Sequence, residues 1–162
     1  IMDAGIRGIE ENYHAYPPVA GYPDLKEAIC NKFKRDNDLD YNPNQIVVSA
    51  GAKQSIVNIM LSLLNPGDEV LIPAPFWVSY PDMVKLAKGT PKHIYAGIEQ
   101  DFKVTPEQLR GALNKKTKVF LFSSPSNPTG SVYTKAELAA FVEVLKNFPD
   151  VIIISILPIL LK

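Results

Sequence analysis

The stretch Val119-Phe120-Leu121-Phe122-Ser123-Ser124-Pro125-Ser126-Asn127-Pro128-Thr129-Gly130 decides the fold of this chain. Residues 119–123 form an apolar run with the length of a buried strand. Residues 124–130 hold two prolines, one glycine and four small polar residues, which predicts a rigid polar loop. Each proline biases the residue before it toward extended geometry, so Ser124 and Asn127 are held in place. Such a loop is suited to a ligand, and a plain strand-to-helix turn is the alternative.

The composition fits one domain and excludes several kinds of partner. A chain of 162 residues can bury a sizeable core. Because 17 Lys+Arg balance 17 Asp+Glu, the sequence predicts no nucleic-acid surface and favours a small neutral or anionic partner. A single cysteine, Cys30, and the lack of a secretory signal predict a cytoplasmic protein. We expect Cys30 to be a buried structural thiol. The first residue is Ile1 rather than methionine, which suggests a fragment.

Strand-like and helix-like segments alternate along the chain. Short apolar runs predict strands at residues 46–49, 70–72, 92–95, 119–123 and 151–155. Helical spacing and start signals, including capping boxes at Thr105 and Thr134, predict helices at residues 24–35, 51–64, 81–87, 105–113 and 134–148. This alternation predicts an α/β fold of three layers, with helices on both faces of a mainly parallel sheet.

Three unusual segments follow the carboxyl ends of predicted strands, at residues 49–54, 73–77 and 124–130. Ligands of open parallel sheets lie beyond these strand ends, so one ligand could contact all three. In the first segment Gly51 allows a tight turn into a helix, whose N-terminus together with Lys53 favours an anion such as phosphate. Neither a Walker loop nor a dinucleotide fingerprint is present, and an ordinary turn is the alternative.

Two aromatic residues are further candidates. Trp77, the only tryptophan, lies in the proline-stiffened segment and could stack on a flat ligand or serve as a packing anchor. Tyr16, in an exposed proline-rich segment, offers a phenol donor or belongs to a plain surface turn. His14 and His93 lie outside any metal-binding spacing, so we predict no metal site. Without a nucleophile elbow or paired carboxylates, the chain needs a bound cofactor for chemistry.

The motifs in residues 16–21, 49–55, 73–80 and 124–130, in this order and spacing, resemble those of the class I pyridoxal-phosphate-dependent aminotransferases (fold type I). The bacterial aspartate aminotransferases are the most similar branch, and the resemblance covers nearly all of residues 13–155. It implies the large domain of that fold with its mostly parallel sheet. It also implies a homodimer that transfers an amino group between an amino acid and a 2-oxo acid.

The resemblance assigns roles to six residues. Gly51, Ala52 and Lys53 would hold the phosphate of pyridoxal 5'-phosphate, and Tyr16 would reach the phosphate of the neighbouring subunit. Trp77 would stack on the pyridine ring and contact the substrate. Asn127 would bind the phenolic oxygen of the ring and help orient the substrate carboxylate, in a loop where the Asn-Pro bond is often cis.

The chain departs from the family pattern after Ser155. The family continues with Ser-Asp-Glu-x-Tyr, whose aspartate pairs with the pyridine nitrogen, whereas Ser155 is followed by Ile156-Leu157-Pro158-Ile159. The lysine that carries the cofactor in this family has no counterpart, because the only later lysine is Lys162. We therefore expect residues 1–155 to be part of the cofactor-binding domain and residues 156–162 to be an aberrant apolar tail. At eleven residues the apolar run 151–161 is too short to cross a membrane.

Three interpretations follow. The first is a truncated piece of an aminotransferase that is inactive alone, with no catalytic residue in this chain. The second is a module that binds phosphate or pyridoxal phosphate without chemistry, for which intact Gly51 to Lys53 and Asn127 are the argument. The third is another enzyme of fold type I, a lyase or a decarboxylase, which the motifs around Trp77 and Asn127 disfavour.

Overall fold

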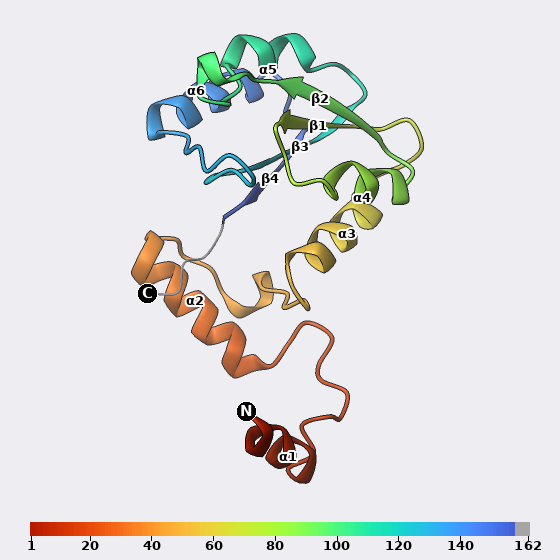
Figure 1. Cartoon of the computed structure of the whole chain (residues 1–162), viewed down its shortest axis with the longest axis vertical. Helices are drawn as coiled ribbons and strands as arrows, with labels where there is room; N and C mark the ends of the chain where they lie inside the picture. Colours follow the sequence, from red (N-terminus) through yellow and green to blue (C-terminus); the bar gives the residue numbers. More distant parts are fainter. Residues whose placement is uncertain (158–162) are drawn as a thin grey trace. The chain divides into compact units, whose positions relative to one another are not determined.

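The computed structural model describes residues 1–157, and the chain forms two compact units, Ile1–Ser55 and a second that begins at Ile56. Figure 1 labels the helices and strands along the chain. The elements, in order, are α1 (Met2–Glu10), α2 (Pro23–Asn37), the 3₁₀ helix η1 (Pro43–Gln45), α3 (Ala52–Leu63), β1 (Glu69–Ala74), α4 (Tyr80–Leu86), β2 (Thr90–Tyr95), the 3₁₀ helix η2 (Ile98–Gln100), α5 (Pro106–Ala112), β3 (Thr117–Ser123), α6 (Lys135–Leu145) and β4 (Ile152–Ile156).

The second unit is built on a four-stranded sheet in which every pair is parallel and the order is β2-β1-β3-β4. The chain leaves β1 on one side to form β2 and then returns to the other side of β1 to form β3. This reversal makes the carboxyl ends of β1 and β3 the topological switch point of the sheet, where a crevice forms in open α/β folds.

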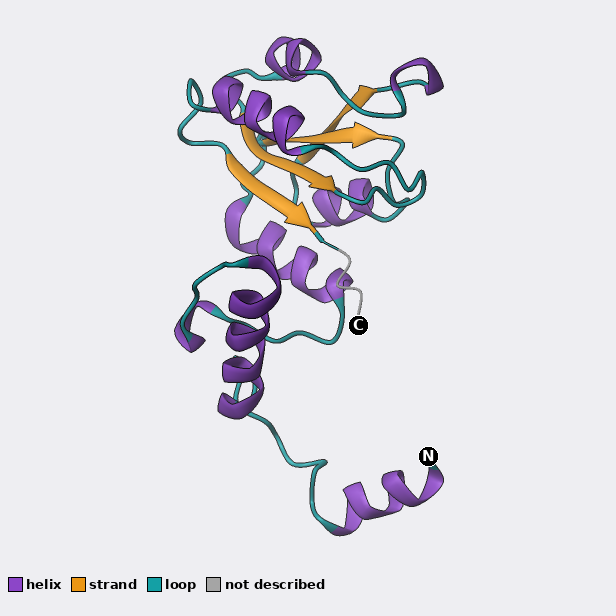
Figure 2. Ribbon diagram, turned by 90° about the vertical axis from the view of Figure 1, so that its left-hand side faces the viewer, coloured by secondary structure: helices purple, strands orange, loops and turns teal. Residues whose placement is uncertain are grey.

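Side chains on the two central strands alternate between two apolar layers, as the twofold period of a strand requires. Leu71 and Phe120 pack on one face with α5 and α6, while Val70 and Val119 pack on the other with α3 and α4. Figure 2 shows helices over both faces of the sheet. Both faces are apolar because both are covered, which explains the continuous apolar runs in the sequence.

The structure confirms the predicted α/β fold and most of its elements. The three-layer arrangement, the parallel sheet and four of the five predicted strands are present, with ends shifted by a few residues. Both predicted capping boxes form, since Thr105 and Thr134 accept hydrogen bonds from the backbone N–H of Gln108 and Glu137. Cys30 is buried, as expected.

The predicted strand at residues 46–49 is wrong. The segment is extended at Ile46, but it pairs with no strand among residues 1–157. Val48 N–H instead donates a hydrogen bond to the carbonyl of Ala20, at 3.1 Å. Val48 packs so closely on Gly21 that a Cβ at Gly21 would lie 2.6 Å from it. An apolar run of four residues becomes a strand only where a neighbouring strand satisfies its backbone groups.

The predicted apolar tail, residues 156–162, is described only in its first part. Ile156 belongs to β4, and residues 158–162 lie outside the described residues. Within residues 1–157 no helix has the length and apolar character needed to cross a membrane.

Candidate functional site

The crevice opens where β1 and β3 separate. The two strands pair from Glu69 as far as Leu71 opposite Phe120, yet β1 continues to Ala74 and β3 to Ser123. Pro73 lies beyond the part of β1 that pairs with β3. It has no N–H to donate to a neighbouring strand. The loops that follow both strands thus start on either side of one opening.

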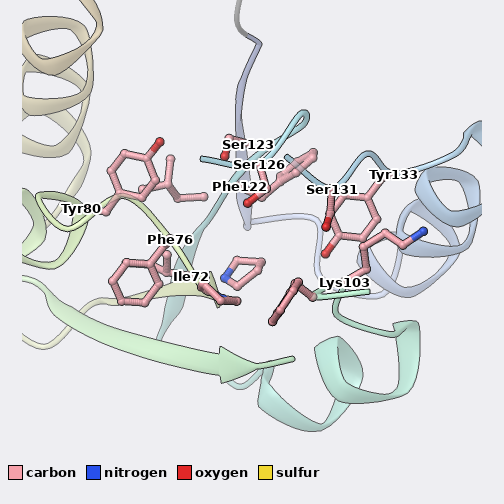
Figure 3. A pocket seen from close by; sticks show the side chains of 13 residues that line it. Ile72, Phe76, Tyr80, Lys103, Phe122, Ser123, Ser126, Ser131 and Tyr133 are labelled. Carbon is pink, nitrogen blue, oxygen red and sulfur yellow. The ribbon is translucent and has the colours of Figure 1, made fainter. Parts of the chain in front are cut away.

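A small pocket lies at this opening. Figure 3 shows its lining, with Tyr80 and Phe76 on one side and Tyr133 and Lys103 on the other. The space measures about 10 Å³, which is room for roughly one water molecule. A cofactor-sized ligand does not fit inside this space, so a ligand of that size would have to contact the exposed loops around it.

The loop of residues 124–130 is held by its own hydrogen bonds. Ser126 N–H donates to the carbonyl of Ser131 at 2.8 Å, and Gly130 N–H donates to the carbonyl of Ser126 at 2.9 Å. Gly130 has φ +78°, a conformation that favours glycine. The buried hydroxyl of Ser124 accepts a hydrogen bond from Tyr133 N–H at 3.1 Å. The Asn127–Pro128 bond is cis, as the resemblance implies. The loop predicted after this strand is therefore present, and these hydrogen bonds connect its residues.

Asn127 lies at the exposed tip of this loop. Its backbone N–H donates to the hydroxyl of Ser123 at 3.3 Å. Within the described residues its side-chain amide makes no hydrogen bond, so a donor and an acceptor are both available on a rigid support.

Ser123 also connects this loop to α4, a link that the sequence analysis missed. The hydroxyl of Ser123 hydrogen-bonds the buried phenol of Tyr80. Burial raises the pKa of Tyr80 and the hydrogen bond with Ser123 opposes that rise, so the phenol is protonated at neutral pH. The pair of hydroxyls at Ser123 and Ser124, directly at a strand end, is the sequence signal that could have indicated this contact.

Trp77 lies on the loop that follows β1. The residue is 36% exposed, and its carbonyl accepts a hydrogen bond from Tyr80 N–H at 3.0 Å. The neighbouring Phe76 packs against His93, with 4.7 Å between ring centroids. Burial and the charge of Lys85 lower the pKa of His93, so this ring is neutral at neutral pH and acts as a packing partner.

Lys103 is the charged residue that lines the pocket, and two carboxylates lie near it. Lys103 lies 2.9 Å from Glu137 and 3.4 Å from Asp101, with its side chain largely buried. The hydrogen bond from Lys103 lowers the pKa of Glu137 to about 2. Tyr133 accepts the N–H of Val104 at 2.8 Å, so the loop before α5 is attached to the loop before α6. Among residues 1–157 no group of His, Cys, Asp or Glu is arranged to hold a metal ion.

The anion-binding candidates lie in the first unit. Gly51 has φ +92°. Its N–H already donates a hydrogen bond within the turn, to the carbonyl of Ser49. The carbonyl of Gly51 accepts from Gln54 and Ser55 in the first turn of α3. Ala52 opens the helix, and its N–H has no partner within the helix. Lys53 is exposed at the same turn, and Tyr16 is fully exposed.

The structure thus brings the loops of Trp77 and Asn127 to the two sides of one crevice. It places Gly51, Ala52 and Lys53 at a helix start with the polarity that an anion requires.

Comparisons with known proteins decide the family. Residues 1–155 match the family model described as aminotransferase class I and II. The chain belongs to the class I and II aminotransferases. It is 56% identical over 155 residues to the aspartate/prephenate aminotransferase of Cereibacter sphaeroides, which covers 96% of this chain and 39% of that protein. It is 50% identical over 156 residues to the aspartate aminotransferase of Bacillus sp. strain YM-2, again over 96% of this chain and 39% of the relative.

Solved aminotransferase structures share the fold. The aspartate aminotransferase from Rhizobium meliloti matches with a TM-score of 0.89 and 39% identity, over 95% of this chain and 38% of that one. The Thermus thermophilus aspartate aminotransferase with maleate matches with a TM-score of 0.88 and 37% identity, over 96% and 41%. These matches confirm the resemblance to aspartate aminotransferases. The chain spans about two fifths of the length of the relatives it matches.

Proposed function

We propose that this chain contributes the pyridoxal 5'-phosphate-binding part of an aspartate aminotransferase. Gly51, Ala52 and Lys53 hold the phosphate, Trp77 stacks on the ring, and Asn127 binds the phenolic oxygen of the ring. In this proposal residues 1–155 belong to the cofactor-binding domain. The family and the names of the relatives support the activity, and the described residues support the binding roles.

The available amide of Asn127 carries the proposal. A ring oxygen that shares negative charge needs a hydrogen-bond donor, and Asn127 offers one on a loop fixed by its own hydrogen bonds. Trp77 is partly exposed and lies on the loop that follows the adjacent strand. The start of α3 offers an N–H and a cation for a phosphate. The donor set therefore fits the cofactor.

The chemistry divides between the cofactor and the protein. Bound pyridoxal phosphate supplies an electron-withdrawing ring that stabilises negative charge at the α-carbon of an amino acid. Asn127 donates to the ring oxygen and orients the substrate carboxylate, while Trp77 limits the tilt of the ring. Ser123 fixes Asn127 through its backbone N–H, and Tyr80 fixes Ser123.

The substrates that we propose are aspartate and a 2-oxo acid, because relatives at 50% identity or more are named aspartate or aspartate/prephenate aminotransferases. We further propose a cytoplasmic homodimer, in which Tyr16 reaches the phosphate of the neighbouring subunit. The complete exposure of Tyr16 leaves its phenol available for that contact.

No residue after Ser155 in the printed sequence matches the family's cofactor-bearing lysine. We therefore predict that these 162 residues bind the cofactor without covalent attachment and do not transaminate by themselves. Turnover of aspartate and 2-oxoglutarate by the purified chain with pyridoxal phosphate, above that of the free cofactor, would contradict this prediction.

Binding is best tested with pyridoxamine 5'-phosphate, which lacks the aldehyde that reacts with surface lysines. Because Trp77 is the only tryptophan, quenching of its fluorescence reports binding directly. We expect saturable quenching, with an affinity about tenfold weaker or more in Asn127→Ala, since a hydrogen bond to a charged oxygen contributes about 1.5–3 kcal/mol.

Asn31→Ala is the matched control, because Asn31 is also an exposed asparagine, lies on α2 and is not among the proposed binding residues. We expect the affinity of Asn31→Ala to equal that of the unchanged chain. Equal affinities for all three proteins would remove Asn127 from the proposed site, and absence of saturable quenching would contradict binding altogether.

A further inference from the structure

Tyr80, the first residue of α4, is buried beside the crevice. The residue is 5% exposed and belongs to the apolar layer that α3 and α4 form on the sheet. Ile72 of β1 and Leu121 of β3 belong to the same layer. The ring is therefore held in a layer that includes residues of both central strands, and Figure 3 shows it on one side of the pocket.

The polar groups of Tyr80 connect the two loops of the proposed site. Its backbone N–H donates to the carbonyl of Trp77 at 3.0 Å. Its phenol hydrogen-bonds the hydroxyl of Ser123, and that hydroxyl accepts the backbone N–H of Asn127 at 3.3 Å. One buried residue thus links the loop of the proposed stacking residue with the loop of the proposed hydrogen-bond donor.

This link lies where the sheet ladder no longer sets the spacing of the two strands. The paired positions of β1 and β3 end at Leu71 and Phe120, whereas the strands continue to Ala74 and Ser123. A flat ring that contacts one loop with its face and the other with its edge needs a defined distance between those loops, held to about 0.5 Å in a preorganised site. Tyr80 supplies a connection between them at this level.

We propose, on the basis of the proposed function, that Tyr80 is a positioning residue, which sets the spacing between Trp77 and Asn127 and acts on the ligand through Asn127. Tyr80→Phe isolates this role. The substitution keeps the ring in its apolar layer and keeps the backbone hydrogen bond to Trp77, and it removes the link to Ser123. The Ser123 hydroxyl then rotates without a fixed partner on α4, so the start of the Asn127 loop is less well held.

A double-mutant cycle tests the proposal, with binding of pyridoxamine 5'-phosphate followed by quenching of Trp77 fluorescence. We expect Tyr80→Phe to bind about threefold to tenfold more weakly than the unchanged chain, which corresponds to the loss of one neutral hydrogen bond. In the Asn127→Ala background we expect the same substitution to change the affinity by less than about twofold, because the residue through which Tyr80 acts is gone. A merely structural role would weaken binding equally in both backgrounds.

Tyr133→Phe is the matched control. Tyr133 is also a buried tyrosine that lines the pocket, but its phenol accepts the N–H of Val104, outside the proposed site. We expect Tyr133→Phe to lose stability and to keep the affinity of the unchanged chain to within about twofold. Loss of stability alone is thereby separated from loss of positioning.

Hydrogen exchange without ligand separates the role of Tyr80 from the proposed function. We expect the backbone amide of Asn127 to exchange about threefold faster or more in Tyr80→Phe, and at the unchanged rate in Tyr133→Phe. Absence of saturable binding by the unchanged chain would contradict the proposed function, and the exchange rates would still decide the role of Tyr80. Equal exchange at Asn127 in Tyr80→Phe and the unchanged chain would overturn the proposal, as would equal affinities or an equal loss of affinity in both backgrounds.

Discussion

Removal of the Tyr133 hydroxyl should destabilise the sheet unit out of proportion to the single atom lost. The phenol accepts the N–H of Val104 at 2.8 Å, and both residues are buried, at 8% and 3% exposure. In Tyr133→Phe the ring contacts with Phe122 and Phe141 remain, so the main change is the loss of this acceptor. A buried N–H left without a partner costs about 1–3 kcal/mol. We expect the free energy of unfolding to fall by that amount.

Equilibrium urea unfolding of both proteins, followed by circular dichroism, measures the difference. The matched control is Tyr95→Phe, because Tyr95 is 73% exposed and its hydroxyl lies 3.5 Å from His93, at the limit of a hydrogen bond. We expect Tyr95→Phe to change the free energy by less than about 0.5 kcal/mol. If Tyr133→Phe is as stable as the unchanged chain, the connection between the loops before α5 and α6 does not contribute as we argue.

Three further predictions concern charge, packing and backbone. Lys103→Met should reduce the loss of stability in acid. Lys103 is the main cause that lowers the pKa of Glu137 from 4.5 to about 2. The contribution of this ion pair to the free energy of unfolding is therefore complete above pH 4.5 and disappears as pH falls toward 2. Thermal midpoints of the unchanged chain and of Lys103→Met, measured across that pH range, test this prediction. An equal fall of the midpoint with pH in both proteins would contradict it. Leu121→Ala, at a fully buried position, should cost about 2–5 kcal/mol in urea unfolding, and a cost below 1 kcal/mol would exclude a tightly packed layer there. Gly51→Ala should lower the stability by about 1–2 kcal/mol, because Gly51 has a positive φ. Gly5→Ala, in the middle of α1, should stabilise that helix. A change in stability of the same sign in both variants would refute the role that we give to the positive φ of Gly51.

The sheet could be predicted because its strands are covered on both faces. Residues 70–72 and 119–123 are continuous apolar runs, and such runs bounded by turn residues indicate buried strands wherever helices pack on either side. The helix starts at Thr105 and Thr134 were equally readable, because a capping box is a local hydrogen-bond pattern.

Other features depended on contacts that no local pattern contains. Residues 46–49 have strand composition, but a strand also needs a partner, and the position of that partner is not a property of the segment. Helix α1 was not predicted, because it contains Gly5 and Gly8, buries no residue and has no side-chain cap. The contact of Ser123 with Tyr80 joins two elements more than forty residues apart, so it required the fold.

The candidate binding residues were identified by motif, while their availability required the structure. The sequence indicates that Asn127 is held by two prolines. Only the three-dimensional arrangement shows that its side-chain amide makes no hydrogen bond within residues 1–157. Similarly, the pocket measures only about 10 Å³ and is too small for the proposed ligand, which would therefore contact the exposed loops.

The central claim is that the start of α3 and the loops after β1 and β3 bind pyridoxal phosphate, and an NMR titration of the labelled chain with pyridoxamine 5'-phosphate tests it most directly. We predict saturable shift changes at the backbone amides of Gly51 and Ala52, the indole N–H of Trp77 and the side-chain amide of Asn127. Shift changes confined to other residues would contradict the account, in particular at the open groove of about 440 Å³ between Asn114 and Asp150.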